Sequence, residues 1–350
     1  MRRTLVVCAA VVAVCAVAGA LHYADVSPTA VFVVSGLALG GLAWLIGMAT
    51  ESVGARFGPA VTGVLQTTLG NLPELFIVLF ALSAGEVVVA QTSILGSLFA
   101  NALLVLGLTI MAGARASAGG VMRFRKRLPN DTATLLLLAL SAIALLGVSD
   151  RIGDRASEHE VEISAAGAVF LLLVYGSWLW SYLRSDRQVE PALEEPHGSL
   201  PFAPAIALLA TAGLAAAFVS DWFVNAIDPA VEALGISKAF TGLVIVAIAG
   251  NAVENVVAVS LAWKGHDDLA ISVVKNSVSQ IACFLFPVLV IASLAFEHRL
   301  TFVVDPVYLG ALALTAIALW QITGDGRAVL FEGLALVSLY VVLATLVWFE

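Results

Sequence analysis

The segment Gly70-Asn71-Leu72-Pro73-Glu74 returns 180 residues later as Gly250-Asn251-Ala252-Val253-Glu254. Each copy places one glutamate inside a long apolar run of the chain. A carboxylate in the middle of a membrane span costs about 3 kcal/mol on insertion scales, so acidic residues there are rare and usually functional. The pair therefore marks a candidate site, and the offset indicates that the two halves of the chain are related.

The composition is that of an integral membrane protein. Of the 350 residues, 61% are hydrophobic and 12% are charged, and the mean hydropathy is +1.01. The net charge is −8 and the basic residues cluster in one loop only, so we expect no nucleic-acid surface. The three cysteines lie in apolar runs and favour packing roles over a disulfide or a zinc site; they are Cys8, Cys15 and Cys283.

Eleven apolar runs are long enough to cross a bilayer as helices. They cover residues 4–21, 29–50, 60–83, 88–112, 131–149, 163–183, 202–219, 238–262, 269–295, 306–322 and 328–347. With a cytoplasmic N-terminus, twelve basic residues of the loops lie inside and four outside, as the positive-inside rule requires. We therefore expect a multi-pass protein of the cell membrane whose C-terminus is outside. The first run also suits a cleaved signal peptide, but the second run follows so closely that we favour a retained helix.

The number of spans in each half predicts how the halves are related. Five spans lie between the first run and a polar linker, and five follow that linker. Because five is odd, the second copy enters the membrane from the opposite side, an inverted-repeat architecture typical of secondary transporters. We expect an all-α integral membrane protein with a first helix and short loop at 1–28, repeat 1 at 29–184, a cytoplasmic linker at 185–201 and repeat 2 at 202–350.

The repeated segments offer oxygen ligands to a hard cation. Glu74 and Glu254 would bring two negative charges, and Ca²⁺ binds about six to eight oxygens. Pro73 has no N–H, so the carbonyl of Leu69 is left free, whereas Val253 stands at the matching position of the second copy. We therefore expect two unequal half-sites. The five histidines all lie in or beside loops, which disfavours a zinc or copper site.

The predicted metal ligands are the residues of the two segments together with the free carbonyl: Glu74, Glu254, Asn71, Asn251, Leu69, Gly70 and Gly250. Nearby polar residues either support these ligands or simply join helices by hydrogen bonds: Gln66, Ser97, Asn101, Asn276, Ser277 and Gln280. Without the cation, two close carboxylates repel and are poorly solvated, so they would take up protons. Competition between protons and cation at one site, exposed alternately to each side, is sufficient for antiport.

Lys275 is a basic residue inside the ninth span. It is two positions from Ser277, about 200° around a helix, so it points away from a cation that Ser277 faces. One interpretation is that its amine reaches the cytosolic surface or pairs with an acid at a helix end, such as Asp267 or Glu51. The other is that Lys275 is an internal cation that modifies ion choice or coupling.

The two segments resemble the calcium/proton exchanger branch of the cation/Ca²⁺ exchanger superfamily. That branch carries Gly-Asn-x-x-Glu in each of two inverted five-helix repeats after a lone first helix. Here Gly96-Ser97-Leu98-Phe99-Ala100-Asn101 follows the first copy and Ser277-Val278-Ser279-Gln280 the second. The resemblance implies a transporter that extrudes cytosolic Ca²⁺ against inward protons, with Glu74 and Glu254 binding both. It implies no cofactor beyond the transported ions, and a monomer or homo-oligomer in the lipid bilayer.

The chain departs from that pattern in the second repeat. Asn255 stands where the family usually has histidine, and Lys275-Asn276-Ser277 replaces an apolar residue followed by Gly-Ser. Exchange of Na⁺, against protons or against Ca²⁺, therefore stays open as an alternative, as does a channel or scaffold. An intramembrane hydrolase is disfavoured, because the spans contain neither a Ser/His pair nor an HExxH helix.

Overall fold

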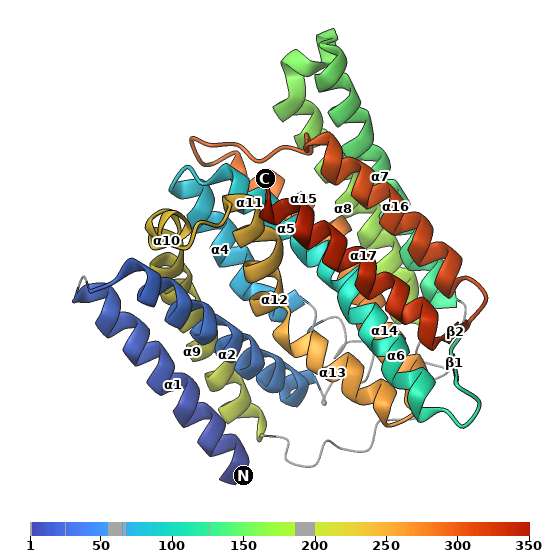
Figure 1. Ribbon diagram of the computed structural model, residues 1–350, viewed down its shortest axis with the longest axis horizontal. Coiled ribbons are helices and arrows are strands. Elements are labelled where there is room, and N and C mark those ends of the chain that lie inside the picture. Colours follow the sequence, from blue (N-terminus) through green and yellow to red (C-terminus); the bar gives the residue numbers. More distant parts are fainter. Residues whose placement is uncertain (1, 25, 55–64, 66–67, 126, 186–199) are drawn as a thin grey trace.

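The computed structural model describes residues 2–24, 26–54, 65, 68–125, 127–185 and 200–350, and these are nearly all helical (Figure 1). The helices before the linker are α1 (Arg2–Tyr23), α2 (Pro28–Gly54), α4 (Leu72–Ser83), α5 (Val87–Phe99), the π-helix η1 (Ala100–Val105), α6 (Leu106–Ala116), α7 (Arg127–Ile152), the 3₁₀-helix η2 (Arg155–His159) and α8 (Glu160–Ser185).

The helices after the linker are α9 (Phe202–Asn225), α10 (Ile227–Leu234), α11 (Lys238–Phe240), the π-helix η4 (Thr241–Val246), α12 (Ala247–Gly250), α13 (Ala252–Trp263), α14 (Asp267–Gln280), the π-helix η5 (Ile281–Leu285), α15 (Phe286–Ser293), α16 (Pro306–Thr323) and α17 (Leu330–Trp348). Two short strands, β1 (Val121–Arg123) and β2 (Arg327–Val329), pair antiparallel. This pairing was not predicted, because three-residue strands in loops carry no periodic pattern.

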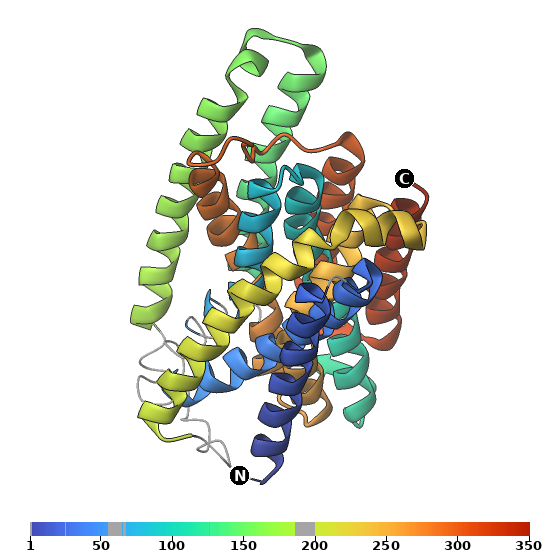
Figure 2. The ribbon, with the colours of Figure 1, turned by 90° about the vertical axis from the view of Figure 1, so that its left-hand side faces the viewer.

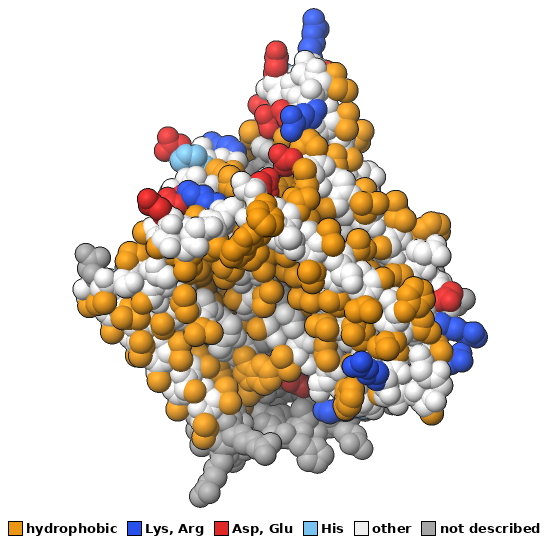
Figure 3. Space-filling model, viewed as in Figure 1, with side chains coloured by type: hydrophobic (Ala, Val, Ile, Leu, Met, Phe, Trp, Pro, Cys, Tyr) orange, Lys and Arg blue, Asp and Glu red, His pale blue; other side chains and the backbone are white. Residues whose placement is uncertain are grey.

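The membrane class predicted from composition is confirmed. Nine helices within the described ranges are long and apolar enough to span a membrane, and a tenth is added if the pair Ile227–Leu234 and Lys238–Gly250, bent by 114°, is one span. Hydrophobic side chains cover the broad face of the molecule, whereas charged side chains gather toward its ends (Figure 3). Such an apolar belt between charged ends suits a protein surrounded by lipid.

The structure corrects two predicted spans. The run 238–262 was expected as one helix, but it breaks at Asn251, whose backbone has φ −91° and ψ 15°. Glycine at position 250 weakens the helix at this point. The preceding helix α10 was missed, because its acidic residues and proline resemble a loop. Most of the predicted run 60–83 before Leu72 lies outside the described residues; its later part is α4.

Elements recur between the two halves at the offset of the motif. Asn71 interrupts the helix before α4 as Asn251 does before α13, with φ −84° and ψ 10°. The turn after each helix uses a glycine in the left-handed region, Gly85 at φ 83° and Gly265 at φ 78°. The helices that follow, α5 and α14, both run on into π-helices, η1 and η5.

The loops lie at two opposite ends of the molecule. One end, named here the C-terminal face, carries Glu86, Lys238 and the C-terminus, and α7 and α8 protrude beyond it (Figures 1 and 2). The other end, the ribbon face, carries the N-terminus, the β1–β2 pair and Asp268, which contacts Arg125. The loops on either side of each long helix thus lie at opposite ends, as spans of one bilayer require.

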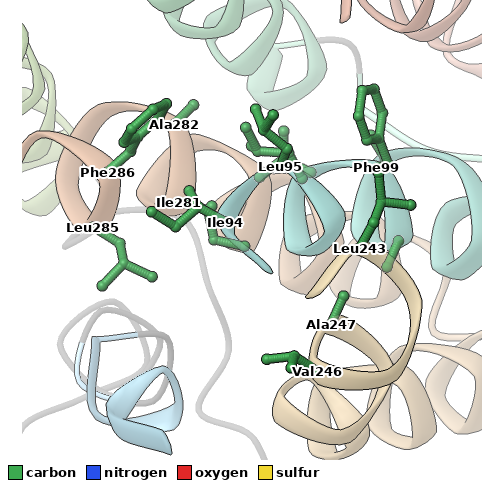
Figure 4. Packing of buried hydrophobic residues seen from close by; sticks show 14 of the residues in the cluster. Ile94, Leu95, Phe99, Leu243, Val246, Ala247, Ile281, Ala282, Leu285 and Phe286 are labelled. Carbon is green, nitrogen blue, oxygen red and sulfur yellow. The ribbon is translucent and has the colours of Figure 1, made fainter. Parts of the chain in front are cut away.

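The core beside the site is an unusually close helix crossing. Side chains of α5, among them Ile94, Leu95 and Phe99, pack with residues of η4, α12 and η5 (Figure 4). A Cβ on Gly96 would overlap the backbone of Leu243. A Cβ on Gly242 would lie 2.9 Å from the amide nitrogen of Ser93. The two backbones therefore touch, and only glycine fits at either position.

Replacing Gly96 by alanine is expected to lower the free energy of unfolding by about 1–3 kcal/mol, because the added methyl group overlaps backbone rather than a movable side chain. Gly310→Ala is the matched control, since nothing lies within 4 Å of its Cβ position in α16. Thermal unfolding in detergent would compare the two variants with the parent. Equal melting temperatures would contradict the close crossing.

Candidate functional site

Each motif glutamate lies in the first turn of a helix that starts at the asparagine break. Glu74 is in the first turn of α4 and Glu254 in the first turn of α13. They are 2% and 3% exposed, so neither carboxylate reaches the surface. The start of a helix presents N–H groups without helical partners and the positive end of the helix dipole, which favour a negative charge there. The break thus places both acids where their charge costs least.

The two motifs, far apart in sequence, meet at their glycines. A Cβ on Gly250 would lie 2.6 Å from the carboxyl carbon of Glu74. A Cβ on Gly70 would lie 3.2 Å from Oε1 of Glu254. Each carboxylate therefore sits against the glycine of the other motif, where a larger residue would displace it. The sequence predicted these glycines as metal ligands and gave no sign of this packing role.

One oxygen of Glu74 is held by two neutral side chains, and a third neutral side chain orients them. The side-chain amide of Asn251 donates to Oε1 of Glu74 at 2.7 Å and to Oγ of Ser97 at 2.9 Å. The Ser97 hydroxyl donates to the same Oε1 at 3.2 Å. Asn101 donates to Oδ1 of Asn251 at 2.7 Å and to the carbonyl of Ser97 at 3.0 Å, which fixes the orientation of the asparagine. Oε2 of Glu74 is left without a hydrogen-bond partner among the described residues.

The second copy has no matching network. Among the residues that the structure describes, several buried oxygens near the second motif have no hydrogen-bond partner: Oε1 of Glu254, Oδ1 of Asn71, Oδ1 of Asn255, Oδ1 of Asn276, Oγ of Ser277 and Oε1 of Gln280. Ser277 matches Ser97 in sequence but lacks its hydrogen bond, so the two halves of the site are unequal.

Unpartnered buried oxygens fit a cation site. Each such oxygen costs about 1–3 kcal/mol if nothing binds it. Across the described ranges no group of three or more His, Cys, Asp and Glu side chains is placed to hold a metal ion. A cation here would therefore rely on two carboxylates plus neutral oxygens, which is the ligand set of a hard cation such as Ca²⁺.

Two of the predicted site residues, Gln66 and Leu69, precede the first motif. Gln66 lies outside the described residues. Leu69 directly precedes the close contact at Gly70, and Pro73 has no N–H to donate to its carbonyl. On the other side of the break, the carbonyl of Asn71 accepts the N–H of Leu75 at 3.0 Å. The role of the Leu69 carbonyl as a ligand stays a prediction.

Lys275 does not reach the surface and pairs with no acid among the described residues, so that interpretation of the sequence was wrong. Its side chain is 0% exposed, and its amine donates to the hydroxyl of Thr323 on α16 at 3.0 Å. The salt bridges found in the described part of the chain do not include it. α14 packs between α6, α7, α13 and η1, and these neighbours bury the side chain. Thr323 was missed, because no local pattern ties it to α14.

The chain is similar to several known proteins over most of its length. The family described as sodium/calcium exchanger protein matches residues 27–183 and 204–349. The chain is 31% identical to a Ca²⁺/H⁺ antiporter of Aphanothece halophytica, over 94% of this chain and 92% of that one. It is 31% identical to the Ca²⁺/H⁺ antiporter ChaA of Bacillus subtilis, over 93% and 92%.

Two solved structures are similar over nearly the whole chain. The native YfkE structure superimposes with a TM-score of 0.82 at 28% identity, covering 97% of this chain and 98% of that one. A structure of the H⁺/Ca²⁺ exchanger CAX has a TM-score of 0.76 at 16% identity, covering 98% and 88%, which is a likeness of fold.

Replacing Lys275 by methionine is expected to raise the free energy of unfolding by about 1 kcal/mol or more. Methionine has a similar volume but no buried amine. Thr323 would stay satisfied, since its hydroxyl donates to the carbonyl of Leu319 at 2.6 Å. Thr323→Val, in contrast, leaves the amine without its partner and is expected to cost about 1–3 kcal/mol. Melting in detergent tests both, and a less stable Lys275→Met variant would contradict the account.

Proposed function

The chain belongs to the sodium/calcium exchanger protein family, and we propose that it is a secondary active transporter that extrudes Ca²⁺ from the cytosol in exchange for protons. The observation that carries this proposal is the pair of buried carboxylates, Glu74 and Glu254, each packed against the glycine of the other motif. Two relatives at 31% identity are named Ca²⁺/H⁺ antiporters, which supports this ion pair.

The proposed architecture is a lone first helix followed by two inverted five-helix repeats, eleven spans in all. Repeat 1 covers 29–184 and repeat 2 covers 202–350, joined by the linker 185–201. The recurrence of the asparagine break, the left-handed glycine turn and the π-helix at one offset supports this division. The basic loop residues favour the ribbon face as the cytosolic side, with the N-terminus inside and the C-terminus outside.

The two halves of the proposed site have different roles in cation binding. Asn251 and Ser97, oriented by Asn101, hold one oxygen of Glu74, so its free oxygen keeps a fixed position. That oxygen, Oε1 of Glu254 and the unpartnered neutral oxygens then offer ligands to Ca²⁺. When the cation leaves, two buried carboxylates remain close together, and protons replace it. Because Ca²⁺ and protons need the same oxygens, they bind in turn, and alternating exposure converts the proton gradient into Ca²⁺ export.

Glu74→Gln and Glu254→Gln are each expected to reduce proton-driven Ca²⁺ uptake into inverted membrane vesicles to background, since each removes one charge and one proton site. Glu162→Gln, at an exposed position of α8, is the matched control and should transport like the parent. An active double variant would refute the assignment. Proton release by Na⁺ and not by Ca²⁺, under the same gradient, would favour the sodium-exchange alternative.

Lys275 is proposed to weaken Ca²⁺ binding through its positive charge. It lies on the far side of α14 from Ser277, about 10–12 Å across one helix, where a unit charge repels a divalent cation by about 3 kcal/mol at an effective dielectric constant near 20. Lys275→Met is therefore expected to lower the Ca²⁺ concentration for half-maximal transport roughly a hundredfold, whereas Lys275→Arg should keep it. If the methionine variant has the same Ca²⁺ concentration for half-maximal transport as the parent, the charge of Lys275 does not affect Ca²⁺ binding.

A further inference from the structure

The two glutamates are carried by two helical hairpins that turn at opposite faces. α4 and α5 turn at Gly85 and Glu86 on the C-terminal face. α13 and α14 turn at Gly265 on the ribbon face, where Asp267 and Asp268 begin α14. Any movement that opens the site to one face must move a hairpin relative to its surroundings at that face.

The α4–α5 turn is tied down by a charge cluster. The amine of Lys238 contacts both carboxylate oxygens of Glu86, at 2.9 and 2.8 Å, and Oδ1 of Asp228 at 2.5 Å. The Glu86 side chain is 14% exposed, so its bond to Lys238 is partly shielded from water, whereas Lys238 and Asp228 are 39% and 58% exposed and their bond is that of a surface ion pair. Lys238 is the first residue of α11, and from there the chain leads through η4 and α12 to Asn251.

The α13–α14 turn is tied down by backbone bonds. The amide of Arg123 donates to Oδ2 of Asp267 at 3.0 Å, and the amide of Arg125 donates to Oδ1 of Asp268 at 2.7 Å. The Arg125 guanidinium also approaches Asp268 at 3.5 Å, but both side chains are at least half exposed, so this ion pair adds little. Here strand β1 and the residues directly after it fix the position of the α13–α14 turn.

The two contacts are reciprocal. Lys238 comes from the second half of the chain and holds a turn of the first half. Strand β1 comes from the first half and holds a turn of the second half. Between the cluster at Lys238 and the site, α5 and η4 touch backbone to backbone at Gly96 and Gly242. In the described conformation the start of α11 and the start of α5 are thus held together next to this crossing.

We propose that the Lys238–Glu86–Asp228 cluster is a latch on the C-terminal face that must open once in every transport cycle, with the β1–Asp267–Asp268 contact as its counterpart on the ribbon face. This inference rests on the proposed antiport. Opening the latch separates the start of α11 from the start of α5. The α5–η4 crossing can then open, and the site is reached from that face. While the latch is closed, exchange is limited to the ribbon face.

The test joins the two sides of the latch by a reversible bridge. Lys238→Cys and Glu86→Cys are combined in a chain whose Cys8 and Cys15 are replaced by alanine, and a short bis-methanethiosulfonate reagent links the two thiols through disulfides. Cys283 is buried and stays. The matched control links Pro229→Cys with Ala233→Cys, two exposed positions four residues apart within α10 on the same face and outside the latch.

The bridged Lys238/Glu86 variant is expected to lose at least nine-tenths of its Ca²⁺ uptake, to keep its Ca²⁺ binding, and to regain uptake when dithiothreitol removes the bridge. The α10 control should transport equally with and without its bridge. Uptake at the unbridged rate while the bridge is present would overturn the latch but not the antiport. Absence of Ca²⁺/H⁺ exchange before any bridging, in the parent as well, would instead refute the proposed function and the latch with it.

Discussion

The structure depends on the mutual packing of two carboxylates against two glycines. Glu74 occupies the space that a side chain at position 250 would fill, and Glu254 approaches the corresponding space at position 70. Both helices break at the asparagine that follows the glycine, so each acid lies in the first turn of a new helix beside the glycine of the other motif. The arrangement also requires the close α5–η4 crossing, which brings Ser97 and Asn251 within hydrogen-bond distance.

The halves of the site are related in sequence but not equal in structure. In one half, neutral side chains already satisfy an oxygen of Glu74, and in the other the oxygens of Glu254, Asn71 and Ser277 are unpartnered. A prearranged oxygen on one side and free oxygens on the other allow a cation to bind with little rearrangement of the first half. Lys275, present in one half only, adds a further inequality on the opposite face of α14.

The motif pair predicted that two acids 180 residues apart would meet, and composition predicted a membrane protein, because both are strong local signals. The break of 238–262 was not predicted, since glycine alone does not tell a weak helix from a broken one. The environment of Lys275 was predicted wrongly, because tertiary packing decides it. The neighbours of α14 bury the side chain, and its amine donates to a hydroxyl on α16. The network through Asn101 needed the structure too, as Asn101 has no counterpart at the same offset.

The central claim is that Ca²⁺ and protons exclude each other from one pair of carboxylates. Calorimetric titration of the purified protein with Ca²⁺, in buffers of equal pH but different ionisation enthalpy, tests it most directly. The account predicts that the heat of binding changes with the buffer in proportion to the protons released, and that this dependence shrinks in Glu74→Gln and Glu254→Gln. Calcium binding whose heat is the same in every buffer would contradict it.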